Sequence, residues 1–375
     1  MYDIVECYYR PTGIIDKMET PYVEMNQKEH GFICGLIREY RPKKVLEVGV
    51  AGGGTTAVIM NCLNEFCPDA MMYSVDINEG CYKREGEQTG FQLNAVRNLL
   101  PNIENHRFLL GKELPCVIEQ VGSNIDFLIL DTVHIMPGEF LDFICALPFL
   151  KDGAIVVLHD ISEHCRVNSP YSYCTRLLLC SVTAKKFYNV DEIDEIRGFF
   201  NIAAFRIDSS TRSEIENVIS ALSVTWQYIP SEKMVNNYYN VYKKYYTEKQ
   251  FSLIQKTVER YRYIDKFAEK REKLLKQLKD FENIYIYGAG YNGNKLKKYL
   301  NQKGYAVKGY VVSDDYYVKE AEKYGEELIL RISDIKNLDK SICCISILDE
   351  GIKEKLDNVG IKNIKLTSEF LRLEL

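Results

Sequence analysis

The sequence has few of the features that mark membrane, nucleic-acid-binding or disulfide-rich proteins. No apolar run approaches the roughly 20 residues that a membrane-spanning helix needs, and the N-terminal residues lack the basic and apolar segments of a secretion signal. The formal net charge is only −5, which leaves no overall basic footprint for a nucleic acid. The 12 cysteines form no C-x-x-C pair and no metal-ligand spacing. We therefore expect a cytoplasmic protein with reduced thiols and without a membrane or nucleic-acid partner.

The length and the hydrophobic pattern predict two α/β domains. The 375 residues exceed the usual size of one domain. Strand-like apolar runs alternate with helical patterns in the first part of the chain and again near its end. We predict a first domain over residues 1–230, a helical connector over 231–280 and a smaller domain over 281–375. The connector has apolar residues at helical spacing among Lys and Glu, so a homodimer through it is expected.

A buried strand breaks into a glycine-rich turn in the stretch KKVLEVGVAGGGTT, residues 43–56. Glycines let the backbone turn sharply and approach a ligand, and a helical pattern follows them. The spacing is not the G-x-G-x-x-G of a dinucleotide fold, and a phosphate-binding G-K-[ST] loop is absent. The pattern indicates a nucleotide-type pocket, and a tight turn without a ligand is the alternative.

A second strand, Met71–Ile77, ends in an acidic residue, Asp76, about 20 residues beyond the glycine turn. A carboxylate at the end of a neighbouring parallel strand is placed to accept both hydroxyls of a ribose. Capping of a helix is the alternative role for such an aspartate. The position favours ribose binding.

These residues resemble motif I of class I S-adenosylmethionine (SAM) dependent methyltransferases, E-x-G-x-x-x-G, which Glu47, Gly49 and Gly53 match. The resemblance implies a Rossmann-like α/β domain with a mostly parallel sheet and SAM as the cofactor. In this family the turn after the third strand borders the adenine. The cofactor-binding residues implied are Glu47, Gly49, Gly52, Gly53, Asp76, Gly111, Lys112, Glu113 and Asp131.

Two later strands deliver polar groups to the same predicted edge of the sheet, because Asp131 ends one and His159-Asp160 end the other. The motifs Leu130–His134 (LDTVH) and Val157–Asp160 (VLHD) resemble those of metal-assisted O-methyltransferases, above all the bacterial methyltransferase family 24. The resemblance implies that Asp131, His159 and Asp160 bind Mg²⁺ or another divalent cation. Val133 stands where many members of that family carry an acidic residue.

Methyl transfer from a sulfonium is an in-line displacement, so the enzyme has to position an oxygen nucleophile and help it to lose its proton. A cation bound by carboxylates would orient hydroxyls and lower their pKa. Alternatively, His134 or His159 would act as a general base without a metal, since imidazole titrates near neutrality. We predict His134 and Asp131 as the catalytic residues.

Near residue 283 the pattern restarts with a strand, a glycine turn and a helix (IYIYGAGYNGNKLKKYL). Gly288, Gly290 and Gly293 have the G-x-G-x-x-G spacing, and Asp314 follows about 20 residues later in the Rossmann manner. The segment resembles the small nucleotide-binding or CoA-binding-like domains of bacterial surface-sugar enzymes. This resemblance implies NAD or a nucleotide sugar as the ligand, and a purely structural module is the alternative.

Taken together, the sequence predicts a SAM-dependent methyltransferase that methylates a hydroxyl of a sugar or nucleotide-linked sugar. Two other functions are open. One is a non-catalytic binding or scaffold protein on the methyltransferase fold, which Val133 suggests. The other is an enzyme that uses a nicotinamide or nucleotide sugar in the second domain.

Overall fold

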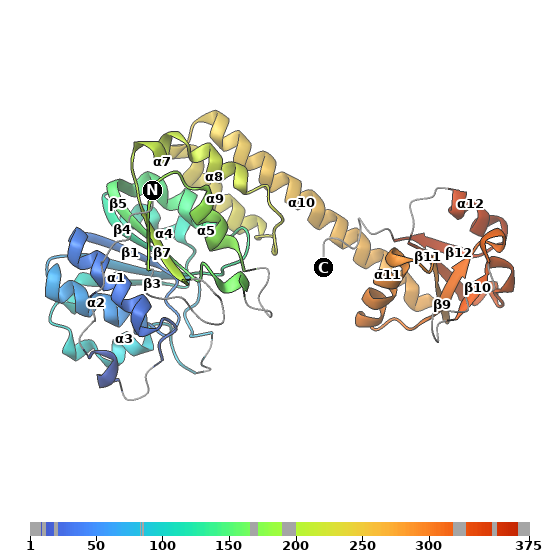
Figure 1. Cartoon of the computed structure of the whole chain (residues 1–375), viewed down its shortest axis with the longest axis horizontal. Coiled ribbons are helices and arrows are strands. Elements are labelled where there is room, and N and C mark those ends of the chain that lie inside the picture. The colour runs from blue at the N-terminus through green and yellow to red at the C-terminus, as the bar shows by residue number, and fades with distance from the viewer. Residues whose placement is uncertain are drawn as a thin grey trace. The chain divides into compact units, whose positions relative to one another are not determined.

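The computed structural model describes residues 9, 13–18, 22–82, 84, 86–165, 172–189, 200–317, 328–346 and 351–366. By its internal contacts the chain divides into two compact units, Met1–Glu259 and Arg260–Leu375 (Figure 1). The division falls within helix α10 (Glu248–Gln277), inside the segment predicted as a helical connector.

The first unit is built on a seven-stranded sheet with the order β3-β2-β1-β4-β5-β7-β6. Strand β7 runs antiparallel to both of its neighbours, and the remaining pairs are parallel. The predicted mostly parallel sheet is therefore confirmed. The strands are β1 Lys44–Val48, β2 Met71–Asp76, β3 His106–Leu110, β4 Ile125–Leu130, β5 Leu150–His159, β6 Lys185–Tyr188 and β7 Ile202–Arg206.

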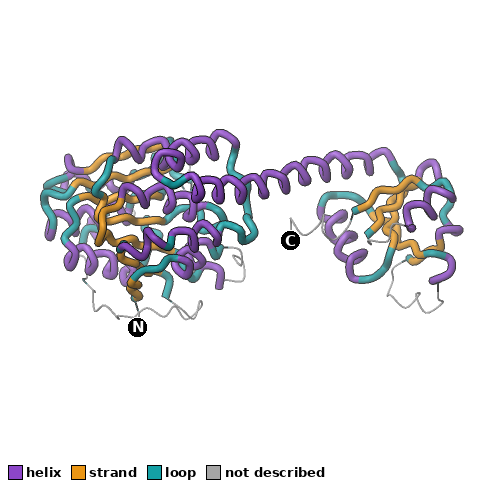
Figure 2. The backbone as a smooth tube through the Cα atoms, turned by 90° about the horizontal axis from the view of Figure 1, so that it is seen from above, coloured by secondary structure: helices purple, strands orange, loops and turns teal. Residues whose placement is uncertain are grey.

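Helices cover both faces of this sheet (Figure 2). Strand β4 is buried along its whole length, which explains why its sequence IDFLIL is apolar except for Asp126. One large core cluster joins Phe32, Ile59 and Phe127, from two helices and the central strand. The helices are α1 Gln27–Tyr40, α2 Gly54–Phe66, α3 Phe91–Ala95, α4 Leu114–Val121, α5 Gly138–Ala146, α6 Cys174–Ser181, α7 Ser209–Ser213, α8 Ile215–Ala221 and α9 Glu232–Tyr245.

Both ends of helix α1 are set by capping interactions in the local sequence. Asn26 accepts hydrogen bonds from the backbone N–H groups of Lys28 and Glu29, and Glu29 Oε2 accepts one from the backbone N–H of Asn26 at 2.7 Å. This reciprocal capping box satisfies donors that the first helical turn leaves open. The helix ends at Tyr40, and the residue that caps it, Arg41, is left-handed with φ 47° and stands immediately before Pro42. The capping box also fixes Glu29 close to the sheet edge.

Helix α9, in the predicted connector, packs on α4 and α5 of the first unit. Tyr242 and Tyr246 donate hydrogen bonds to the backbone carbonyls of Leu141 and Ile144, at 2.8 and 2.6 Å. The buried side chains of α9 therefore cover its own unit. A homodimer through the connector stays a prediction.

The second unit has a five-stranded parallel sheet with the order β10-β9-β8-β11-β12. The order reverses between β8 and β11, as it does in open α/β sheets that bind ligands at this point. The predicted small Rossmann-like fold is confirmed. The elements are β8 Asn283–Tyr287, α11 Tyr291–Gln302, β9 Val307–Val312, β10 Ile329–Arg331, β11 Ser341–Ile345, α12 Gly351–Asn358 and β12 Lys362–Lys365.

Among the residues that the structure describes, no helix combines the length and the apolar character needed to cross a membrane. The cytoplasmic location stays a prediction.

Candidate active site

A cavity of about 960 Å³ opens at the carboxyl ends of β1, β2, β4 and β5 in the first unit. This volume lies within the range of small-molecule sites, roughly 300–1,000 Å³. Of the residues predicted to contact the cofactor, Gly111 alone is not part of its lining. The predicted residues that line it are Glu47, Gly49, Gly52, Gly53, Asp76, Lys112, Glu113 and Asp131.

The glycine loop is held against the end of β4. Gly49 has φ 95°, and a Cβ atom there would lie 1.7 Å from the carbonyl oxygen of Asp131. Gly53 has φ 78° and precedes α2, and a Cβ atom there would lie 2.7 Å from Gly90 Cα. These positions require glycine on both conformational and steric grounds. The loop therefore connects β1 to α2, and at its glycines only backbone atoms face the cavity.

Asp76 fastens this loop to β2. Its Oδ2 accepts hydrogen bonds from the backbone N–H groups of Val50 and Ala51, at 2.9 and 3.2 Å. Its Oδ1 accepts a third from the backbone N–H of Asn78 at 2.8 Å. Each carboxylate oxygen can accept more than one hydrogen bond, so these contacts leave capacity for a ligand. Asp76 thus shapes the loop, and its role in ribose binding stays a prediction.

Glu47 lies at the floor of the cavity and is only 2% exposed. Its Oε2 accepts hydrogen bonds from the hydroxyls of Thr56 and Ser74, at 2.9 and 2.6 Å. Burial raises the pKa of the Glu47 carboxyl to about 8, against the lowering effect of these two hydrogen bonds. The side chain is therefore mostly protonated at neutral pH, which lets it donate as well as accept a hydrogen bond.

Helix α9 contributes to the same cavity through Met234 and Tyr238. Tyr238 donates a hydrogen bond to Asp142 Oδ1 at 2.6 Å, and Asn237 donates one to Glu113 Oε2 at 2.9 Å. Burial raises the pKa of Asp142 to about 7, against the lowering effect of the Tyr238 hydrogen bond. The amphipathic pattern of this segment predicted a helix but gave no sign of a role in the cavity.

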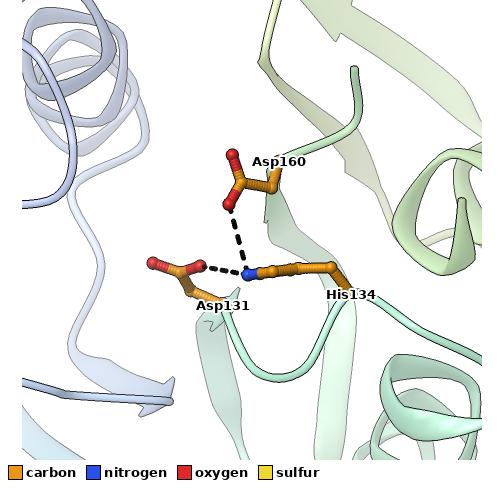
Figure 3. Close-up of side chains that lie close together, drawn as sticks. All are labelled: Asp131, His134 and Asp160. Carbon is orange, nitrogen blue, oxygen red and sulfur yellow. Dashed lines mark ion pairs between the residues drawn. The ribbon is translucent and has the colours of Figure 1, made fainter. Parts of the chain in front are cut away.

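Asp131, His134 and Asp160 form a triad at the carboxyl ends of β4 and β5 (Figure 3). His134 Nε2 lies 3.2 Å from Asp160 Oδ2 and 3.6 Å from Asp131 Oδ1. One donor atom from each residue can be chosen so that all three lie within 4.8 Å of one another. Among the described residues, no other group of His, Cys, Asp and Glu offers this geometry.

The turn that carries His134 is shaped by Glu139 at the start of α5. Glu139 Oε1 accepts hydrogen bonds from the backbone N–H of His134 at 2.7 Å and from the hydroxyl of Thr132 at 3.0 Å. These contacts hold His134 in a left-handed conformation, φ 58°, that is unusual for a non-glycine residue. Glu139 was not predicted, because no motif distinguishes it from a helix-start acid.

The neighbouring carboxylates set the pKa of the His134 imidazole. Burial lowers the pKa of the imidazole, but the hydrogen bond and charge of Glu139 and the charges of Asp131 and Asp160 raise it to about 9. Without a bound cation His134 is therefore an imidazolium at neutral pH. An imidazolium cannot accept a proton, so His134 would first have to lose this proton to act as the general base, and that role stays a prediction.

His159, predicted as a metal ligand, lies one layer deeper and is 3% exposed. Its Nδ1 is 3.2 Å from Asp131 Oδ1 and its Nε2 is 3.2 Å from Glu29 Oε1. Burial lowers the pKa of His159, but the nearby charges of Asp131 and Asp160 raise it well above its usual value. The same Nδ1 lies 3.7 Å from Asp160 Oδ2, so His159 as well as His134 lies beside both aspartates. The role of His159 as a metal ligand stays a prediction.

Two functional candidates were missed by sequence reasoning, Glu29 and Asn201. Both line the cavity, and both are 2% exposed. Asn201 Nδ2 donates hydrogen bonds to Glu29 Oε1 at 3.0 Å and to Asp160 Oδ1 at 2.7 Å. In the sequence Glu29 marks only a helix start, and Asn201 stands in a strand-like segment without a motif.

Residues 46–161 match the family model of a methyltransferase domain, methyltransferase family 24. The matched segment runs from β1 to the residue after Asp160, so it contains the glycine loop, Asp76 and the triad. No curated protein sequence matches the chain at a significant level. The resemblance of the first domain to class I methyltransferases is confirmed.

The solved structures to which the chain is similar include two bacterial O-methyltransferases. The O-methyltransferase TomG from Streptomyces achromogenes, involved in tomaymycin synthesis and solved in complex with SAM, is 14% identical with a TM-score of 0.38. The alignment covers 51% of this chain and 84% of that one. The O-methyltransferase from Bacillus cereus, solved in complex with SAH, is 14% identical with a TM-score of 0.38, and the alignment covers 50% of this chain and 84% of that one.

Proposed function

We propose that the class I SAM-dependent methyltransferase domain of the first unit methylates a hydroxyl of a sugar or nucleotide-linked sugar, assisted by a divalent cation. The observation that carries this proposal is one cavity that contains both the glycine loop and the triad Asp131, His134 and Asp160. An in-line displacement needs the methyl group and the acceptor oxygen at a distance of about 3–3.5 Å in the right orientation. A single cavity with a cofactor loop and a polar triad suits that requirement.

The triad fits a hard divalent cation. It offers two carboxylate oxygens and one imidazole nitrogen within 4.8 Å of one another, and metal–ligand bonds of about 2.0–2.6 Å bring donors this close. The side chains are 17–19% exposed, so the site is open toward the cavity. Mg²⁺ or Mn²⁺ suits this donor set, and the cation would replace the proton on His134. When bound, such a cation orients acceptor oxygens and lowers the pKa of a coordinated hydroxyl.

The remaining chemistry belongs to the side chains of the chain itself. The glycine loop and Asp76 position the cofactor, because they form the turn between β1 and α2. As the acceptor oxygen attacks the methyl carbon, the bond from that carbon to sulfur breaks and the hydroxyl proton has to leave. His134 is either protonated or bound to the cation, so Asp131 and Asp160 are the carboxylates in the triad that can take this proton.

A polyhydroxylated acceptor is supported by hydrogen-bonding side chains near the triad. Thr132 and Glu163 line the same cavity, each within three residues of a triad aspartate. Polar groups placed this way fix the orientation of a ligand in a site. The test is methyl transfer from labelled SAM, with and without Mg²⁺, to a panel of nucleotide sugars, free sugars and a catechol. Transfer to the catechol alone would refute the sugar assignment, and no transfer would refute the catalytic proposal.

Replacement of Asp76 by Ala should weaken SAM binding by about 10- to 100-fold, because hydrogen bonds to a charged group contribute about 1.5–3 kcal/mol each. The variant loses the carboxylate that fastens Val50 and Ala51, together with any contact to the ribose. Calorimetric titration with SAM measures the change. Asp69→Ala is the matched control, since Asp69 is an exposed residue before the same strand. A SAM affinity equal to that of the control would show that Asp76 does not contribute to SAM binding.

A nucleotide site in the second unit stays a prediction. Gly288 has φ 96°, and a Cβ atom at Gly293 would lie 1.8 Å from the carbonyl oxygen of Gly288, so both glycines shape the turn between β8 and α11. Asp314 Oδ1 accepts a hydrogen bond from the backbone N–H of Ser333 at 3.3 Å. Gly290, at the start of α11, differs, because a Cβ atom there meets nothing within 4 Å.

Gly290→Leu therefore tests ligand binding at a position where the added Cβ atom meets no atom of the fold within 4 Å. If NAD or a nucleotide sugar sits on the turn, the wild-type chain should bind it and the variant should lose at least about tenfold in affinity, the factor for 1.4 kcal/mol. Titration with NADH and with UDP-glucose measures this. Equal binding by both chains, or none by the wild type, would favour a purely structural module.

A further inference from the structure

A second layer of polar side chains lies directly behind the triad. It consists of Glu29 from α1, His159 from the end of β5 and Asn201, which precedes β7. All three are at most 3% exposed. Glu29 and Asn201 fall outside the segment 46–161 that matches the methyltransferase family. This layer, which we call the support layer, thus joins parts of the first unit that are far apart in the sequence.

Two arms connect Glu29 to the two aspartates of the triad. In the first arm, His159 lies between Glu29 Oε1 and Asp131 Oδ1, 3.2 Å from each. In the second arm, the amide of Asn201 donates to Glu29 Oε1 at 3.0 Å and to Asp160 Oδ1 at 2.7 Å. A single oxygen of Glu29 therefore faces the nitrogen atoms that hold both Asp131 and Asp160.

The support layer is itself fixed by the backbone around it. Glu29 Oε2 accepts the backbone N–H of Asn26 at 2.7 Å, so the two oxygens of Glu29 have separate partners. Asn201 Oδ1 accepts the hydroxyl of Ser162 at 2.8 Å, which sets the orientation of its amide. A buried polar network in which the members have partners of this kind is rigid, and one broken link leaves a costly unpaired group.

We propose that Glu29 is a positioning residue for the triad: through His159 and Asn201 it sets the orientation of Asp131 and Asp160. The inference rests on the cation site of the proposed function. The donors behind Asp131 and Asp160 hold both carboxylates in place whether protonated His134 or a cation lies beside them. Groups that orient metal ligands in this way typically change metal affinity or activity by about 10- to 100-fold when they are removed.

Glu29→Gln separates this role from that of a helix cap. The side chain keeps its size but has only one acceptor oxygen, so it cannot accept from Asn26 and also from the His159 and Asn201 side. Asp208→Ala is the control for a lost cap, because Asp208 Oδ1 caps α7 by accepting the backbone N–H of Thr211 at 3.0 Å. Asn201→Ala cuts the arm to Asp160, together with the hydrogen bond from Ser162, and leaves the α1 cap intact.

The experiment measures Mn²⁺ binding by electron paramagnetic resonance, SAM binding by calorimetry, thermal unfolding, and kcat and KM for the best acceptor. We expect Glu29→Gln and Asn201→Ala to weaken Mn²⁺ binding by about 10- to 100-fold, with kcat reduced and SAM affinity unchanged. Asp208→Ala should lower the melting temperature and leave Mn²⁺ binding as in the wild type.

The outcomes distinguish this inference from the function on which it rests. Wild-type Mn²⁺ affinity in both Glu29→Gln and Asn201→Ala would overturn the positioning role and leave the cation site standing. Loss of thermal stability in Glu29→Gln without loss of Mn²⁺ affinity would show that Glu29 acts only as a helix cap. If the wild-type chain binds no Mn²⁺ while it binds SAM, the cation site fails and the inference fails with it.

Discussion

Gly49→Ala should abolish SAM binding and methyl transfer in the first unit. The new Cβ would lie 1.7 Å from the carbonyl oxygen and 2.6 Å from the carbonyl carbon of Asp131. Both atoms belong to the backbone, so no side chain can rotate away to relieve the clash. Gly49 also has φ 95°, which L-residues with a side chain rarely adopt. Either the glycine loop or the end of β4 has to move, at a cost of several kcal/mol, about 3 or more.

Gly86→Ala is the matched control for this substitution. Gly86 has φ 87°, and a Cβ atom there meets nothing within 4 Å, so the control carries the conformational cost without the clash. Calorimetry with SAM and thermal unfolding compare the two variants. If Gly49→Ala bound SAM as well as Gly86→Ala did, close contact between the loop and Asp131 would not be needed for cofactor binding.

The sequence predicted the parts of the fold that depend on continuous apolar runs. Strands β1, β2, β4 and the part of β5 from Ala154 onward are mostly buried, so apolar residues dominate them, with single polar residues such as Glu47, Ser74 and Asp126 inside them and further polar residues at the strand ends. Polar residues at those ends then had to meet at one edge of the sheet. Strand β6 (Lys185–Tyr188) was missed, because it is a short strand in which Phe187 alone is fully buried.

The sequence could not show how the two histidines are arranged around the aspartates. His134 follows β4 and His159 ends β5, and both lie beside Asp131 and Asp160. Their arrangement depends on Glu139, which holds the left-handed turn of His134, and on Glu29, which faces the ring of His159. These contacts link residues whose spacing carries no signal. Tertiary packing, which brings α1 and β7 to the edge of the sheet, decided the outcome.

In the second unit the sequence predicted the local fold but could not show whether a ligand binds. The glycine spacing correctly predicted a strand, a turn and a helix, because Gly288 and Gly293 touch across the turn. That contact explains two of the three glycines by packing alone. Of the three glycines, only Gly290 would accept a Cβ atom without contact to the fold, and a ligand is the explanation for glycine there that its substitution tests.

Asp131→Asn should lower kcat by about 10²- to 10⁴-fold, the range expected when a positioned proton-transfer group is lost. The substitution keeps the shape of the side chain but removes the negative charge that faces both His134 and His159. It also removes one of the two carboxylates proposed to bind the cation, so the apparent Mg²⁺ requirement should shift to higher concentration. Rates at saturating SAM, measured over a series of Mg²⁺ concentrations, test both effects.

Asp126→Asn is the matched control, because Asp126 lies on β4, the strand that Asp131 follows, and is not part of the cavity lining. Its carboxylate accepts the backbone N–H groups of Lys43 and Lys44 and pairs with Lys151, so its loss should cost stability but little rate. Equal rates for Asp131→Asn and Asp126→Asn would show that Asp131 takes no part in the reaction. A rate lost in Asp131→Asn but restored by high Mg²⁺ would assign Asp131 to cation binding, whereas a loss that Mg²⁺ does not restore would assign it to proton transfer.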